Sequence, residues 1–168
     1  NLHRNQLEEN GMGLYDLTAY DIIRRNAINH ADRVGVIDGD RRCTFQQFKN
    51  MVDLLANGLQ NVGIRKGDRL AVLAKNSLEY LVLYGAAAKI GAVMLVINWR
   101  LSEVEIGYIL NDCTPKLVFA DDEYQEIMSN AATTVDSVEK KYSMAAAKGD
   151  FTGFDTLYLP GGGEDVDV

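Results

Sequence analysis

The chain has 168 residues, of which 47% are hydrophobic and 24% are charged, as is typical of one globular domain. Its 17 Lys and Arg residues stand against 24 Asp and Glu residues, and the net charge of −7 disfavours nucleic acid and anionic membranes as partners. Two cysteines, Cys43 and Cys113, are too few for a disulfide framework or a cysteine-rich zinc site, and they favour a reducing, cytoplasmic location.

The first elements along the chain are expected to be a lead-in, a helix and a hairpin. Residues 1–13 are polar and aperiodic, and we expect them to form a flexible lead-in. Asp16 or Thr18 can cap the helix that follows. Residues 34–37 and 41–44 have the pattern of two short strands around an Asp-Gly-Asp turn, which predicts an N-terminal hairpin.

The clearest local signal begins at Thr44. Thr44 and Gln47 have the spacing of a capping box, which marks the start of a helix. The apolar residues after it recur at spacings of three and four and form one face: Phe45, Phe48, Val52, Leu55, Leu59 and Val62. Gly63 suits the left-handed end of this helix, and the strand expected over residues 69–74 is apolar enough to be buried on both faces.

The alternation of helix and strand then repeats. A helix that begins at Asn76 or Ser77 is expected to lead into a buried strand over residues 92–97. Residues 81–97 are almost wholly apolar, but Lys89 lies in their middle, and a central Lys would cost a membrane-spanning helix roughly 2.5–3.5 kcal/mol. We therefore expect a buried helix followed by a buried strand, with no transmembrane segment.

Two further helices are expected before residue 150. Ser102, with a Glu three residues later, forms a second capping box, and a strand is expected over residues 116–120. Asp121 or Asp122 is expected to cap a last helical stretch, which residues 133–134 can interrupt. Its apolar side comprises Tyr124, Ile127, Met128, Ala131, Val135, Val138 and Tyr142.

Apolar strands separated by helices predict an α/β fold, a doubly wound and mostly parallel sheet with helices on both faces. Residues 14–150 are expected to form this unit as a partial domain of a larger protein. Residues 151–168 are acidic and include a run of three glycines, and we expect them to form a linker.

The usual catalytic and metal-binding patterns are missing, so no catalytic residue and no metal ligand is assigned. His30 follows the first helix without a partner at metal-ligand spacing, and no Gly-x-Ser-x-Gly elbow surrounds a serine. Residues 161–163 are followed by acids that would repel a phosphate. The Asp121-Asp122 pair is expected to cap a helix rather than to bind a cation.

Arg100 is the strongest candidate for a ligand contact. It follows a predicted strand directly, at the edge of the sheet where open α/β folds place ligands. The structural alternative is an Arg that stacks on Trp99 or pairs with Glu103 at a helix start. Both interpretations stay open from the residues alone.

The linear order of several short motifs resembles the N-terminal subdomain of AMP-forming acyl- and aryl-CoA synthetases, members of the adenylate-forming superfamily with luciferases and adenylation domains. The resemblance covers residues 17–122. The matching segments are Thr44-Phe45-Gln46-Gln47-Phe48, the helix with Gly58, Gly63-Ile64-Arg65-Lys66-Gly67-Asp68-Arg69, Asn76-Ser77 with Glu79-Tyr80, Lys89-Ile90-Gly91-Ala92-Val93, and Asn98-Trp99-Arg100-Leu101-Ser102 with Glu105.

The resemblance implies an ATP-dependent carboxylic acid–CoA ligase with Mg²⁺, in the setting of fatty acid metabolism. The acid attacks the α-phosphate of ATP to give an acyl-adenylate, and the thiol of coenzyme A then displaces AMP. In the family, the phosphate loop and the later catalytic motifs follow this region, so the isolated chain is expected to be inactive and to hold no cofactor tightly. The acyl pocket is also built mostly from later residues, so the acid itself is not indicated.

The resemblance carries one ligand contact over to this chain. In some family members the Arg of the Asn-x-Arg-Leu segment approaches the phosphates of coenzyme A, which makes Arg100 the expected contact. Many relatives have Pro two residues before the Asn, where this chain has Val96. A carboxylic acid and coenzyme A are the expected partners, and a homodimer is left open. The alternatives are an adenylation domain that loads a carrier protein and a non-catalytic α/β interaction module.

Overall fold

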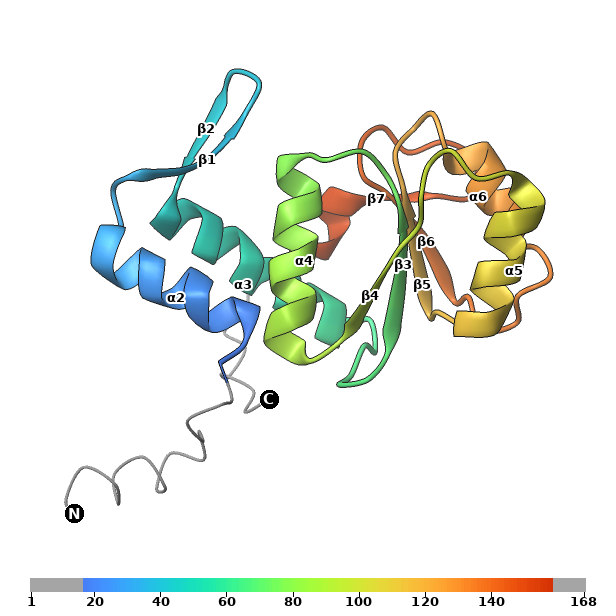
Figure 1. Cartoon of the computed structure of the whole chain (residues 1–168), viewed down its shortest axis with the longest axis horizontal. Helices are drawn as coiled ribbons and strands as arrows, with labels where there is room; N and C mark the ends of the chain where they lie inside the picture. The colour runs from blue at the N-terminus through green and yellow to red at the C-terminus, as the bar shows by residue number, and fades with distance from the viewer. Residues whose placement is uncertain (1–16, 159–168) are drawn as a thin grey trace, which may run out of the picture.

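The computed structural model describes residues 17–158, and over this range the chain forms a parallel sheet between two helical layers (Figure 1). The strand order is β4-β3-β5-β6-β7, and every neighbouring pair is parallel. The strands are β3 (Arg69–Leu73), β4 (Val93–Val96), β5 (Leu117–Ala120), β6 (Lys140–Ser143) and β7 (Thr152–Gly153). The predicted doubly wound α/β fold is confirmed.

Helices cover both faces of the sheet because its strands are apolar on both faces. One layer contains α3 (Phe45–Asn61) and α4 (Leu78–Ile90), with α2 (Ala19–His30) packed against them, and the other contains α5 (Glu103–Cys113) and α6 (Gln125–Ala132) (Figure 1). In β5, Leu117 and Phe119 belong to the core beneath α3 and α4, whereas Val118 and Ala120 belong to the core beneath α5 and α6.

The helices α2, α3, α4 and α5 begin where the sequence predicts caps. Thr18, Thr44 and Ser102 each accept a hydrogen bond from the backbone N–H three residues later, and that third residue's side chain accepts one in return. The helix α4 begins after Ser77 and ends at Gly91, whose φ of 68° lies in the left-handed region that favours glycine.

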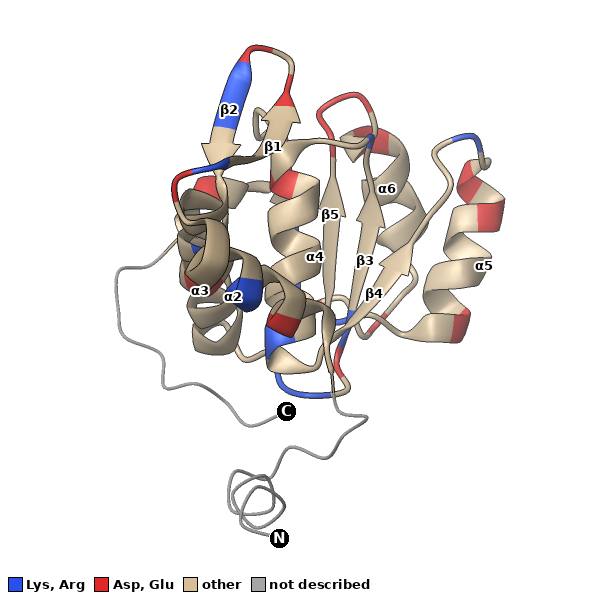
Figure 2. Cartoon of the chain, turned by 60° about the vertical axis from the view of Figure 1, so that its left-hand side comes forward, with Lys and Arg blue, Asp and Glu red and all other residues tan. Residues whose placement is uncertain are grey.

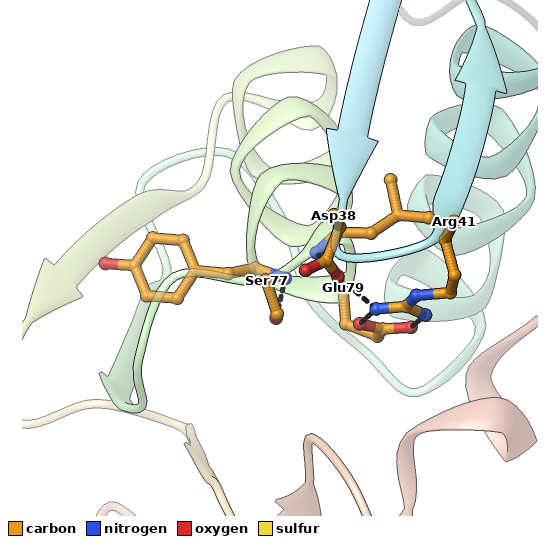
Figure 3. Close-up of polar contacts among 6 residues, drawn as sticks. Asp38, Arg41, Ser77 and Glu79 are labelled. Atoms are coloured by element: carbon orange, nitrogen blue, oxygen red, sulfur yellow. Dashed lines mark hydrogen bonds and ion pairs between the residues drawn. The ribbon is translucent and has the colours of Figure 1, made fainter.

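The predicted hairpin is present as β1 (Val34–Asp38) and β2 (Arg41–Thr44), and it is tied to the start of α4. Figure 3 shows Arg41 between the carboxylates of Asp38 and Glu79, with Nη2 of Arg41 2.9 Å from Oε2 of Glu79. The backbone N–H of Leu78 donates to Oδ2 of Asp38 at 3.0 Å. The Arg41 guanidinium lowers the pKa of the Glu79 carboxyl, so both acids stay charged and hold the hairpin against α4.

The expectation of a buried strand over residues 92–97 is wrong in one respect. Within residues 17–158, the strand β4 lies at the edge of the sheet and pairs with β3 alone. The exposed fractions of Val93 and Val96 are accordingly 50% and 58%. An apolar sequence predicts a strand of a covered sheet, but it does not tell whether a neighbour lies on each side.

The prediction of the last helix is also wrong in part. The helix α6 ends at Ala132, beside the expected interruption, and residues 140–143 form β6 instead of continuing the helix. Tyr142 therefore lies in the sheet, where its ring stacks on that of Phe119 at a centroid distance of 5.5 Å. With two lysines among its four residues, β6 lacks the apolar run that marks the other strands.

The linker expected over residues 151–168 does not begin at residue 151. Residues 151–158 contain β7 and the 3₁₀ helix η1 (Phe154–Leu157), and Phe151, Phe154 and Leu157 are buried. These apolar side chains complete the core. The glycine and acid content of the segment predicted a linker because it gave no weight to these three residues. Residues 159–168 and the expected lead-in over residues 1–13 lie outside the described residues.

Lys89, which interrupts the apolar run, lies in a charged network between α2, α3 and α4. Its Nζ is 2.9 Å from Oδ1 of Asp53, which also accepts a hydrogen bond from the Tyr20 hydroxyl at 2.6 Å. Lys49 donates to Oδ2 of Asp53 at 2.6 Å. The carboxylate of Asp53 thus neutralises the buried ammonium of Lys89. No helix within residues 17–158 has the length and apolarity needed to span a bilayer.

Candidate functional site

The candidate site lies at the carboxyl edge of the sheet, where the segments after three adjacent strands come together. β3 lies between β4 and β5, and parallel strands deliver their carboxyl ends to one edge. Lys75 follows β3, Trp99 and Arg100 follow β4, and Tyr124 precedes α6 after β5. We call these four residues the carboxyl-edge cluster.

The loop between β4 and α5 holds Trp99 and Arg100 against each other. Oδ1 of Asn98 accepts a hydrogen bond from the backbone N–H of Arg100 at 3.0 Å, and the carbonyl of Asn98 accepts one from Leu101 at 3.1 Å. The guanidinium carbon of Arg100 lies 4.0 Å from the centroid of the Trp99 ring. A guanidinium on an aromatic face keeps its N–H edges available for an anion.

Lys75 joins the two aromatic rings of the cluster. Its Nζ lies 5.6 Å from the Trp99 centroid and 5.7 Å from the Tyr124 centroid, and the two rings stack with centroids 6.4 Å apart. The Lys75 ammonium is also 2.6 Å from Oε1 of Glu123, and this hydrogen bond raises the pKa of Lys75. Lys75 is therefore a permanent cation at neutral pH.

The carboxylate of Asp121 anchors the end of β3 instead of capping α6, so the expected cap is wrong. Its Oδ2 accepts a hydrogen bond from the backbone N–H of Lys75 at 2.7 Å. The N-cap of α6 is Tyr124, which makes no side-chain capping bond. Burial raises the pKa of Asp121, and the hydrogen bond from Lys75 opposes that shift. Asp121 thus positions the cluster.

The structure places Arg100 in the stacked geometry that was one of the two alternatives. Glu103, the other expected partner, accepts a hydrogen bond from Asn130 at 3.1 Å. Stacking and phosphate binding are compatible because they use the face and the edge of the guanidinium respectively. The cluster brings together two aromatic rings, the stacked Arg100 guanidinium and a Lys75 ammonium that is paired with Glu123, so Arg100 is the cation that can meet a phosphate.

Two members of the cluster escaped the sequence interpretation. Lys75 and Tyr124 were not singled out, although both follow predicted strands and could have been placed at the same edge as Arg100 by the parallel topology. A metal site is a separate question. Within residues 17–158, no three His, Cys, Asp or Glu side chains are grouped so that they could hold a metal ion.

A family model described as AMP-binding enzyme matches residues 23–156 of the chain. The long-chain-fatty-acid–CoA ligase FadD13 of Mycobacterium tuberculosis is 34% identical over 118 residues, which cover 70% of this chain and 22% of that protein. The fatty acid–[acyl-carrier-protein] ligase ScoC of Streptomyces coeruleorubidus is 34% identical over 88 residues, 52% of this chain and 17% of that protein.

A solved structure has the same fold. The anthranilate–CoA ligase AuaEII in complex with anthranoyl-AMP superposes with a TM-score of 0.78 at 26% identity, over 88% of this chain and 28% of that one. The chain therefore spans less than a third of the length of each of these proteins.

Proposed function

The chain belongs to the AMP-binding enzyme family, and from this premise we propose that it forms the N-terminal part of an AMP-forming carboxylic acid–CoA ligase. Such a ligase joins the acid to AMP from ATP and then transfers the acyl group to the thiol of coenzyme A. The relatives support this assignment, because FadD13 is a ligase of long-chain fatty acids and AuaEII one of anthranilate. A fatty acid or an aromatic acid is the substrate class that these relatives suggest.

We assign to Arg100 the binding of a coenzyme A phosphate. The observation that carries this assignment is the stacking of the Arg100 guanidinium on Trp99, 4.0 Å from its centroid, at the carboxyl edge of the sheet. Stacking holds the guanidinium in one orientation before the ligand arrives, and its planar fork matches two oxygens of a phosphate. Lys75, at the end of β3, lies against the same Trp99 ring, where Glu123 pairs with its ammonium.

ATP and Mg²⁺ are assigned to other parts of the ligase. The described residues include no carboxylate cluster suited to Mg²⁺, and the chain carries no Ser/Thr/Gly-rich phosphate loop with a Lys. When bound, the metal would neutralise the phosphates during adenylation. These residues would therefore contribute the fold and the coenzyme A contact, and we expect neither half-reaction from the 168 residues alone.

The Arg100→Ala variant of a ligase that contains this region tests the proposal. We expect the KM for coenzyme A to rise about ten-fold, because one charge-assisted phosphate contact of about 1.4 kcal/mol is lost. Acid-dependent ATP–pyrophosphate exchange should be unchanged. Arg42→Ala, at an exposed position of the hairpin, is the matched control. An unchanged KM would leave Arg100 with a purely structural role, and a loss of exchange would place it in adenylation.

A second candidate acceptor is a carrier protein, which the similarity to ScoC supports. The phosphopantetheine arm of a carrier protein lacks the nucleotide of coenzyme A. If Arg100 contacts only that nucleotide, Arg100→Ala should leave the reaction with a carrier protein unchanged. Comparing the two acceptors in the same Arg100→Ala enzyme separates the two functions.

We also propose a cytoplasmic location, because Cys43 and Cys113 are both free thiols.

A further inference from the structure

Two cations lie against the Trp99 ring, and they differ in what neutralises them. The guanidinium carbon of Arg100 is 4.0 Å from the ring centroid, and within residues 17–158 this guanidinium makes no ion pair, since Glu103 is bonded to Asn130. The ammonium of Lys75 lies 5.6 Å from the same centroid, but it is only 2.6 Å from the Oε1 atom of a glutamate, Glu123. That carboxylate therefore occupies one of the two cations of the carboxyl-edge cluster.

The loop after β5 keeps the Glu123 carboxylate beside the end of β3. The two strands are paired, and Oδ2 of Asp121 accepts a hydrogen bond from the backbone N–H of Lys75 at 2.7 Å. Tyr124 fixes the other end of the loop, because its ring stacks on that of Trp99. Figure 2 shows this acidic loop and the basic turn between β4 and α5 at the same edge of the sheet. Glu123 thus lies between two anchored residues, within reach of Lys75.

The ion pair of Lys75 and Glu123 is accessible to a ligand. The two side chains are 52% and 51% exposed. An exposed pair of this kind is weak, because water and salt screen it. A terminal phosphate carries nearly two negative charges, so it can take an ammonium from a carboxylate that carries one. A phosphate at this edge would therefore compete with Glu123 for Lys75.

We propose that Glu123 is an affinity-determining residue of the coenzyme A site, because its carboxylate competes with a ligand phosphate for the Lys75 ammonium. The inference rests on the proposed contact between Arg100 and coenzyme A, and it extends that contact to a second strand end. Coenzyme A carries a 3′-phosphate and a pyrophosphate, so one phosphate can meet Arg100 while another reaches Lys75. In the unaltered chain, the ligand gains the second contact only by breaking the pair of Lys75 with Glu123.

Glu123→Gln tests the proposal, because it removes the competing charge and keeps the size of the side chain. Titration calorimetry of coenzyme A into the 168-residue chain should give a Kd about three- to ten-fold lower in this variant than in the unaltered chain. The gain is that of one added charge-assisted contact. Combining Glu123→Gln with Lys75→Met should cancel the gain, because Met cannot pair with a phosphate.

Asp122→Asn is the matched control, because it removes one negative charge from the same loop without freeing Lys75. Asp122 pairs with Lys148 at 3.5 Å, and its side chain is 47% exposed, close to the value for Glu123. Lys148 lies between β6 and β7, farther from Trp99 in the strand order than Lys75. We expect the Kd of Asp122→Asn to differ by less than about two-fold from that of the unaltered chain. Thermal melting should show all three variants folded, since the substituted side chains are exposed.

Three results would overturn the role of Glu123 and leave the proposed function in place. They are an unchanged or higher Kd in Glu123→Gln, an equal gain in Asp122→Asn, and a gain that survives Lys75→Met. The proposed function fails in a different way: coenzyme A would bind with a Kd that Arg100→Ala does not change. Absence of coenzyme A binding in the unaltered chain and in every variant would overturn both proposals.

Discussion

Asp53→Asn should lower the free energy of unfolding by about 3 kcal/mol, because it removes the carboxylate that neutralises a buried ammonium. The side chain of Lys89 is only 7% exposed, and its Nζ lies 2.9 Å from Asp53. Asn keeps the size of the side chain and can still accept the hydrogen bond from Tyr20. The loss therefore reports the charge and not the packing.

Urea denaturation of matched variants measures this effect. Asp136→Asn, at an exposed position, should change stability by less than about 0.5 kcal/mol. Asp53→Asn combined with Lys89→Met should recover most of the loss, because an apolar side chain replaces the buried charge. If Asp53→Asn were as stable as the control, Lys89 would not depend on Asp53 for its neutralisation.

The same pair contributes to the dependence of stability on pH. The hydrogen bonds from Lys49, Tyr20 and Lys89 outweigh burial and lower the pKa of Asp53 below its usual value. A carboxyl with a depressed folded-state pKa stabilises the fold above its unfolded pKa, near 4, and loses that contribution as the pH falls through the folded pKa. Acid unfolding should therefore be less steep in Asp53→Asn than in the unaltered chain.

Gly58→Ala should destabilise the chain by about 2 to 3 kcal/mol, although alanine is the better helix former by about 1 kcal/mol. A Cβ at Gly58 would lie 1.7 Å from the carbonyl oxygen of Leu157 and 2.7 Å from its carbonyl carbon. Both are backbone atoms of η1, so the methyl group can fit only if η1 moves. That movement would expose Phe154 and Leu157, which are buried in the core.

Gly107→Ala in α5 provides the control for the change in helix propensity. A Cβ at Gly107 would meet only the carbonyl oxygen of Ala131, at 3.5 Å, which is an ordinary contact. This variant should be unchanged or more stable by up to about 1 kcal/mol in the same denaturation experiment. Equal effects of the two substitutions would contradict the close packing of α3 against η1.

Local signals explain which parts of the fold could be predicted from the sequence. Capping boxes at Thr44 and Ser102 mark helix starts because the bonds involved span only three residues. The exposure of β4 depends on the strand order, which no local pattern encodes. β6 is short and carries two lysines, and η1 contributes Phe154 and Leu157 to the core from either side of two polar residues, Asp155 and Thr156.

The candidate site was predictable in part for the same reason. Arg100 could be found because it follows a strand and lies in a recognisable motif. Lys75 and Tyr124 are separated from it in sequence and meet it only because β3 lies between β4 and β5. The stacking of Arg100 on Trp99, open from the residues alone, is set by the turn at Asn98.

Titration of coenzyme A into the chain, followed by the fluorescence of Trp99, tests the central claim most directly. Trp99 is the only tryptophan of the sequence, and it contacts Arg100 within the cluster. We expect a saturable change in emission with coenzyme A and none with pantetheine, which lacks the nucleotide phosphates. The Kd should rise about ten-fold in Arg100→Ala and stay unchanged in Arg42→Ala. Equal responses to coenzyme A and pantetheine, or an unchanged Kd in Arg100→Ala, would contradict a coenzyme A phosphate site at this edge of the sheet.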